Sequence, residues 1–206
     1  REEVSPSVDL VLDTSASLFL TPAKALRTLE LYAFALSSAA QLRGNLRCFL
    51  LTGPTVTPLP TEAGLDRERL AAAVRPEPGR PALEQVPWRS GSLRIWISDL
   101  LFPGAPHLGP LAGGKGVVFV PWCREEAEPE WAGNLEMHDC ETGERRVRRL
   151  NPAVLKEYRA AYQRHFQLWQ AEARRCGVAL ARVGAEPPFL EALKPEAFPH
   201  GAVEPA

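Results

Sequence analysis

Short apolar runs alternate with longer amphipathic stretches along most of this chain. Several of the runs have the length and composition of strands and are bounded by turn-forming residues. The predicted strands cover residues 8–12, 46–52, 93–99, 116–120 and 178–183. Residues 55–59 follow a Gly-Pro turn, and their prolines fit only an edge strand. This alternation predicts a doubly wound α/β domain, with helices on both faces of a mostly parallel sheet.

The amphipathic stretches predict the helices of this domain. A long helix is predicted over residues 23–42, with Thr21 as its N-cap and Gly44 at its end. Its expected inward face carries Leu26, Leu29, Ala33, Leu36 and Ala40. A second long helix is predicted over 151–176, with its core stripe at Leu155, Tyr158, Tyr162, Phe166, Trp169 and Ala173. Shorter helices are predicted over 66–74 and 188–193.

Residues 134–150 break the alternation and predict a β-hairpin, because two runs of alternating residues flank a Glu-Thr-Gly-Glu turn. The second arm is rich in arginine, and Arg146 and Arg148 are candidates for binding a partner protein. Charges on an exposed edge strand also prevent aggregation, so the pattern fits both roles.

Composition narrows the class of protein. A length of 206 residues, with 45% hydrophobic and 24% charged residues, fits one soluble globular domain. With a net charge of −1, no global electrostatic field argues for binding to nucleic acid or an acidic membrane surface. The four cysteines lack metal-ligand spacing, which predicts reduced thiols in a reducing compartment. No run of about 18 apolar residues occurs, so no membrane span is predicted.

The sequence begins at Arg1 and has a single methionine, Met137. We therefore expect residues 1–206 to be one domain of a longer chain. Whether residues before Arg1 include a membrane anchor is left open. The expected location is the cytoplasm, either as a cytoplasmic protein or as the cytoplasmic part of an anchored one.

Oxygen-bearing side chains follow two of the predicted strands. Asp13, Ser15 and Ser17 come after the first strand, and Asp99 ends the strand over 93–99. Carboxyl ends of parallel strands open into one crevice, so these side chains are expected to meet there. Hard oxygen ligands suit Mg²⁺, and the sequence therefore predicts a site for Mg²⁺, or for Mn²⁺ or Ca²⁺ in its place. The alternative is that Asp13, Thr14 and Ser15 only cap the helix that follows.

The Asp13-x-Ser15-x-Ser17 loop after an apolar strand resembles the metal-ion-dependent adhesion site of von Willebrand factor A domains. More specifically, the chain resembles the bacterial "domain of unknown function 58" family. Four stretches carry this resemblance: Leu10 to Ser17, Trp96 to Asp99, the turn from Asp139 to Gly143, and Tyr158 to Val178.

The resemblance implies a von Willebrand factor A-like, Rossmann-like fold and a protein-interaction role. It implies that the metal bridges to a carboxylate of the partner, and that a MoxR-type AAA+ ATPase is a partner. The chain departs from the family pattern where a threonine ligand is usual, because Gly79-Arg80-Pro81 stands there. Arg80 is therefore a further candidate for partner binding, and the metal site is expected to be incomplete.

An enzyme is the competing interpretation. An apolar strand that ends in aspartate also begins the loop of haloacid-dehalogenase-like phosphotransferases, in which Asp13 would be the nucleophile. The acid/base aspartate of that chemistry would stand where this chain has Ser15. The sequence also lacks a Gly-x-Ser-x-Gly elbow and a Gly-Lys-Ser/Thr phosphate loop. We therefore expect a non-enzymatic module.

Overall fold

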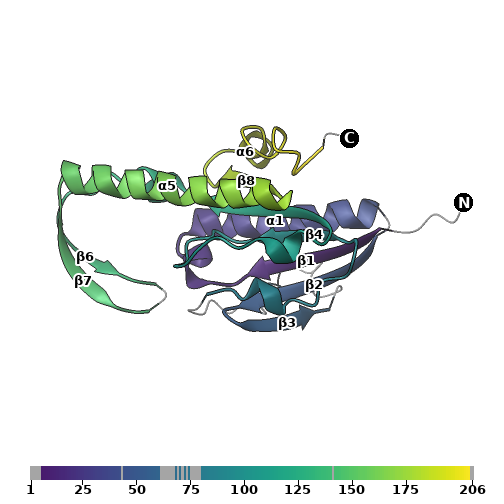
Figure 1. The fold of residues 1–206 in the computed structure, drawn as a ribbon. Helices are drawn as coiled ribbons and strands as arrows, with labels where there is room; N and C mark the ends of the chain where they lie inside the picture. The colour runs from purple at the N-terminus through teal and green to yellow at the C-terminus, as the bar shows by residue number, and fades with distance from the viewer. Residues whose placement is uncertain are drawn as a thin grey trace, which may run out of the picture.

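A mostly parallel sheet forms the centre of the molecule (Figure 1). The structure is a computed structural model that describes residues 6–42, 44–60, 68, 70, 72, 74, 80–140 and 142–204. Across the sheet the strands run in the order β3 (Thr55–Leu59), β2 (Asn45–Thr52), β1 (Ser7–Asp13), β4 (Leu93–Ile97), β5 (Lys115–Trp122) and β8 (Ala179–Gly184). Neighbouring strands are parallel except for β3, which pairs antiparallel with β2 at the edge. The predicted strands and the proline-bearing edge strand are confirmed.

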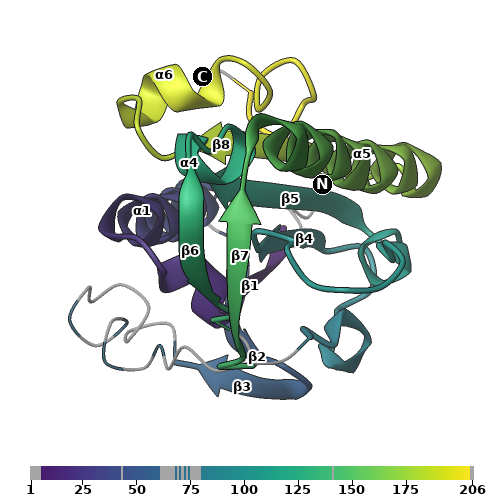
Figure 2. The same ribbon diagram turned by 90° about the vertical axis from the view of Figure 1, so that its left-hand side faces the viewer.

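Helices cover both faces of this sheet (Figure 2). Because side chains alternate along a strand, β1 sends Leu10 and Leu12 to one face and Val11 to the other. Helices α1 (Pro22–Gln41) and α6 (Phe189–Leu193) pack on the first face. Helix α5 (Pro152–Cys176) packs on the second. The doubly wound α/β fold predicted from the sequence is confirmed.

The buried face of α1 differs from the predicted one. Leu26, Ala33 and Ala40 are exposed. The buried side chains are instead Lys24, Arg27, Thr28, Leu31, Tyr32, Ala35, Leu36 and Ala39. The prediction was wrong because it placed every charged residue of the helix outside, whereas Lys24 and Arg27 find polar partners inside. The cap was predicted correctly, since the Thr21 hydroxyl accepts a hydrogen bond from the Lys24 N–H.

Helix α5 follows its predicted pattern more closely. The Asn151 side chain caps its start, and Gly177 ends it in the left-handed conformation, with φ of 66°. Tyr162, Phe166, Trp169 and Ala173 of the predicted stripe are buried. The first turns of the helix are more exposed because they extend beyond the sheet (Figure 1).

The predicted hairpin is also present, as β6 (Gly133–His138) and β7 (Arg145–Leu150). It forms its own two-stranded sheet, which leaves the body near the start of α5 and curves back towards the sheet (Figure 1).

The remaining described elements are short: η1 (Ala16–Phe19), η2 (Leu83–Gln85), η3 (Gly109–Leu111) and α4 (Arg124–Ala127). Most of the helix predicted over 66–74 lies outside the described residues. Within the described ranges, no helix has both the length and the apolar character needed to cross a bilayer.

Candidate functional site at the carboxyl edge of the sheet

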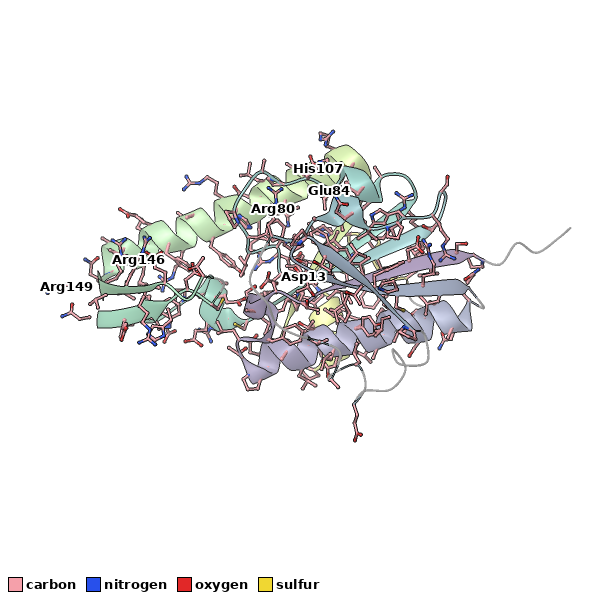
Figure 3. The ribbon with its side chains drawn as sticks, turned by 90° about the horizontal axis from the view of Figure 1, so that it is seen from below. Asp13, Arg80, Glu84, His107, Arg146 and Arg149 are labelled. Atoms are coloured by element: carbon pink, nitrogen blue, oxygen red, sulfur yellow. The ribbon has the colours of Figure 1, made fainter. Side chains whose placement is uncertain are left out.

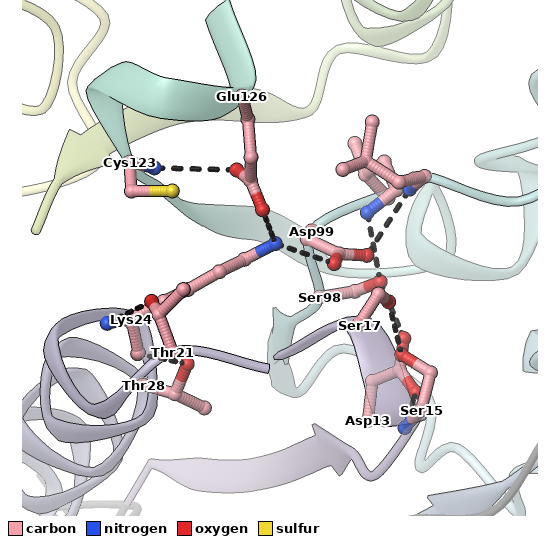
Figure 4. A network of polar contacts seen from close by, with 12 residues as sticks. Asp13, Ser15, Ser17, Thr21, Lys24, Thr28, Ser98, Asp99, Cys123 and Glu126 are labelled. Carbon is pink, nitrogen blue, oxygen red and sulfur yellow. Dashed lines mark hydrogen bonds and ion pairs between the residues drawn. The ribbon is translucent and has the colours of Figure 1, made fainter. Parts of the chain in front are cut away.

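The residues predicted as metal ligands meet at one edge of the sheet (Figure 4). Strands β1 and β4 are parallel neighbours, so both end at this edge. Asp13 is the last residue of β1, and Asp99 follows β4 closely. Ser15 comes between β1 and η1, and Ser17 lies in η1, where its hydroxyl donates to the Ser15 hydroxyl oxygen at 3.3 Å. The structure therefore brings the predicted set together.

Asp13 is completely buried, and both of its carboxyl oxygens already have donors. Oδ1 accepts from the Ser15 N–H at 2.8 Å, and Oδ2 accepts from the Ser98 hydroxyl at 2.6 Å. Burial and the neighbouring negative charge of Asp99 raise the pKa of Asp13 to about 7, against the opposing effect of these hydrogen bonds. Ionisation of this carboxyl group is therefore less favourable than that of an exposed aspartate.

The loop that carries Asp99 is held in a constrained shape. Leu100 adopts a φ of 59°, which is uncommon for a residue with a branched side chain, and it is completely buried. The Leu100 N–H donates to the Ser98 hydroxyl at 3.2 Å, and the Leu101 N–H donates to Asp99 Oδ1 at 3.1 Å. A strained backbone conformation persists only where its surroundings hold it in place. The constrained backbone sets the direction in which the Asp99 side chain points.

A buried lysine stands beside Asp99 (Figure 4). Lys24, in the first turns of α1, is inaccessible to solvent, and its ammonium donates to Asp99 Oδ2 at 2.8 Å. The same ammonium forms an ion pair with Glu126 of α4. Burial lowers the pKa of Lys24, but the charges of Asp99 and Glu126 outweigh this effect and raise it above its usual value. Lys24 is therefore a buried cation.

Glu126 is fixed in turn by its neighbours. Its Oε2 accepts from the Cys123 N–H at 3.2 Å, and the backbone carbonyl of Glu126 accepts from the Tyr158 hydroxyl at 2.8 Å. Lys24 thus connects α1, the loop after β4 and α4 in one network.

This arrangement disfavours a magnesium ion. Within the part of the chain that the structure describes, no three His, Cys, Asp or Glu side chains form a group that could hold a metal, and the predicted set has only two such side chains, Asp13 and Asp99, beside the serine hydroxyls. Mg²⁺ needs several oxygens in near-octahedral geometry, whereas the carboxylates here already accept hydrogen bonds, one of them from an ammonium. Thr52 does not supply the missing hydroxyl, because it hydrogen-bonds Thr14 at 2.6 Å. The metal site stays a prediction, which this geometry disfavours.

A cleft of about 760 Å³ opens over the cluster. Ser17, Asp99 and Phe102 line one side of it. His138 and Thr142, from the tip of the hairpin, line another. The curvature of the hairpin towards the strand ends, seen in Figures 1 and 2, explains how these distant segments share one cleft.

Apolar and aromatic side chains make up much of the remaining lining. Leu20 is 63% exposed, and Trp131 and Tyr158 stand with their ring centroids 6.4 Å apart. The Trp131 indole N–H donates to Glu125 at 2.9 Å. Aromatic side chains with one apolar and one polar end are enriched at protein interfaces.

The three arginines predicted to bind a partner lie in two places. Arg80 lines the cleft, with its guanidinium 5.8 Å from the centre of the Phe102 ring. Arg146 and Arg148 line a smaller hollow on the hairpin, where Arg146 pairs with Glu144 at 2.9 Å. Figure 3 shows Arg146 on the projecting hairpin, away from Asp13 at the sheet edge. Their role in partner binding stays a prediction.

Sequence reasoning missed Lys24, Ser98 and Glu126. Ser98 precedes Asp99, so its position at the strand end was a usable signal. No local pattern marks Lys24 or Glu126, because each takes its role from partners far away in the chain.

The phosphotransferase alternative finds no support in this geometry. A nucleophilic aspartate must reach its substrate, whereas Asp13 is buried and hydrogen-bonded through both oxygens.

No protein-family model and no curated protein matches this sequence. Among solved structures, the chain is similar to the conserved hypothetical protein BatB from Bacteroides thetaiotaomicron, with 15% identity and a TM-score of 0.49. That similarity covers 96% of this chain and 100% of BatB. The chain is also similar to the pilus adhesin SpaC from Lactobacillus rhamnosus GG, with 12% identity and a TM-score of 0.31, over 89% of this chain and 25% of that one. Likenesses of this degree do not bear on function.

Proposed function

We propose that this chain is a non-enzymatic protein-interaction module that binds its partner in the cleft at the carboxyl edge of the sheet. The observation that carries the proposal is the cleft itself, whose volume of about 760 Å³ lies between the strand ends, α4 and the hairpin tip. Leu20, Trp131 and Tyr158 expose apolar surface there. Binding energy in protein interfaces concentrates on such side chains when a partner removes water from them.

The proposed partner is a MoxR-type AAA+ ATPase, as the family resemblance implies. The same resemblance implies a metal bridge to a carboxylate of the partner. Because Lys24 already neutralises part of the charge of Asp99, the proposal relies on the surface of the cleft and needs no bridging ion. A cytoplasmic location stays the prediction for this chain and would bring it into contact with such an ATPase.

A matched pair of leucine variants tests the proposal. Leu20 in the cleft is 63% exposed, and Leu190 on α6 is 67% exposed but lies outside the cleft lining. We expect Leu20→Glu to weaken binding to the MoxR-type ATPase of the same organism by at least roughly tenfold, since it puts a charge into the apolar part of the interface. Leu190→Glu should bind as the wild type does. Biolayer interferometry with both purified proteins measures the difference.

Two results would argue against the proposal. The first is the absence of saturable binding by the wild type. The second is equal weakening by both variants, which would place the contact elsewhere or reduce it to general hydrophobic adhesion.

A further inference from the structure

The strongest feature that the proposed function leaves unused is the environment of Lys24, which lies beneath the cleft. Its ammonium is inaccessible to solvent and lies between carboxylates from two other parts of the fold, Asp99 and Glu126 (Figure 4). Thr21 fixes the start of the helix by accepting the Lys24 N–H, and the Thr28 hydroxyl donates to the Lys24 carbonyl at 2.9 Å. The lysine is thus placed by its helix and is not a surface side chain that has folded inwards.

Hydrogen-bond donors from the chain already serve the carboxylates around it. Both oxygens of Asp13, Asp99 and Glu126 accept at least one hydrogen bond each. Backbone N–H groups donate three of these six hydrogen bonds and a serine hydroxyl donates one. Lys24 donates the other two and is the one fully charged donor among them. The charge that a cation would supply to this edge of the sheet therefore comes from the lysine.

A divalent ion at Asp99 would compete directly with this ammonium. It would meet a like charge at close range beside Lys24 and Asp99, which are almost fully buried, so the repulsion would be weakly screened. If it displaced Lys24, a buried ammonium would lose its partners with no access to water, which is strongly unfavourable. The two cations therefore exclude each other.

We infer that Lys24 is the built-in cation of this site and takes the place of the divalent metal that the oxygen-rich strand ends predict. The ammonium holds α1, the loop after β4 and α4 together in the way that a structural ion would. Its consequence is that the fold of this edge, and any binding in the cleft above it, is independent of divalent metal. This inference concerns the folded chain itself and goes beyond the proposed partner.

The first experiment is a calorimetric titration of the wild-type protein with Mg²⁺ and with Mn²⁺, together with melting curves in EDTA and in each ion. We expect no saturable binding and an unchanged Tm. Saturable binding that is lost in Asp99→Asn would overturn the inference, because it would show that a metal and Lys24 coexist at the site. This titration uses no Lys24 variant, so it tests the inference even if such a variant does not fold.

The second experiment removes the ammonium. Lys24→Met keeps most of the side-chain volume and leaves Asp99 and Glu126 uncompensated, and we expect its Tm to fall by about 6–20 °C. Lys194→Met is the matched control, because Lys194 pairs with Glu191 at 2.6 Å but is 60% exposed, so its Tm should stay close to that of the wild type. A Tm for Lys24→Met equal to that of the control would overturn the inference.

The third experiment restores a cation. Lys24→Ala vacates the space beside the carboxylates, and we expect Mn²⁺ or Mg²⁺ to raise its Tm in a saturable way. The added change Asp99→Asn should abolish that response. A folded Lys24→Ala protein that ignores both ions would refute the equivalence of the ammonium and the metal.

The experiments distinguish a failure of the Lys24 inference from a failure of the proposed function. If the ATPase does not bind, in EDTA or in Mg²⁺, the interaction proposal fails while the results on Lys24 stand. If the ATPase binds only in Mg²⁺ and the wild-type chain itself takes up the ion, the inference fails while the interaction stands.

Discussion

Asp9 provides a quantitative test of how buried charges support this fold. It lies on β1 and is completely buried, at the opposite end of the strand from Asp13. Its Oδ1 accepts from the guanidinium groups of Arg47 and Arg89, each at 2.9 Å. Its Oδ2 accepts from the backbone N–H of Arg89 at 2.8 Å and from the Ser92 hydroxyl at 3.0 Å. The carboxylate therefore joins β1 to β2 and to the segment before β4.

The variant Asp9→Asn keeps the size of the side chain but removes its charge and turns an N–H₂ group towards some of these donors. Removing one member of a buried ion pair costs about 3–5 kcal/mol. The cost here should be near the lower limit, because Arg47 and Arg89 keep 35% and 21% of their side-chain surface exposed and can regain water. We expect a loss of about 3 kcal/mol in the free energy of unfolding at pH 7, or roughly 6–12 °C in Tm.

The loss of stability caused by Asp9→Asn should depend on pH and become smaller in acid. Burial raises the pKa of Asp9, but the hydrogen bonds from Arg47, Arg89 and the Ser92 hydroxyl outweigh it and lower the pKa below its ordinary value. A lowered folded-state pKa gives stability that is fully present above about pH 4 and is lost as the pH falls through that folded-state value. The difference between wild type and Asp9→Asn should therefore be constant near neutrality and shrink in acid.

Urea denaturation followed by circular dichroism, at a series of pH values, measures the loss of unfolding free energy at pH 7 and its change in acid. Glu191→Gln is the control, because the ion pair of Glu191 with Lys194 is exposed and should contribute less than about 1 kcal/mol. A difference below 1 kcal/mol for Asp9→Asn at pH 7, or one that does not shrink in acid, would refute the reasoning.

Two further predictions concern the core and the thiols. Trp169→Ala should lower the free energy of unfolding by about 3–5 kcal/mol, since Trp169 is buried against the rings of Trp96 and Phe102. Leu168→Ala, at an exposed position on the same helix, should change it by less than about 0.5 kcal/mol. Equal effects in chemical denaturation would contradict the packing described for α5. Cys140, exposed at the hairpin tip, should react with a maleimide before Cys48, because Cys48 is buried and its burial raises the pKa of the thiol. Mass spectrometry after brief labelling of the wild type and of Cys140→Ser checks this order. Early labelling of Cys48 would contradict the prediction.

The elements of this fold could be predicted from the sequence because their signals are local. Apolar runs of strand length marked β1, β2, β4, β5 and β8, and the cap Thr21 marked the start of the first long helix. The hairpin was predictable from its turn and its alternating arms. The meeting of Asp13 and Asp99 was predictable as well, because each follows a strand of a parallel sheet and such strands end at one edge.

Contacts between distant residues decided the rest. The ion pairs of Lys24 join it to Asp99, 75 residues away, and to Glu126, 102 residues away, so no window of sequence contains them. These partners reverse the usual preference of a lysine for the surface and set the buried face of α1, which helical periodicity alone placed incorrectly. The sequence by itself determined that oxygen-bearing side chains gather at this edge of the sheet. Only the tertiary structure decided that an ammonium lies among them, because the free energy of a buried charge depends on what surrounds it in space.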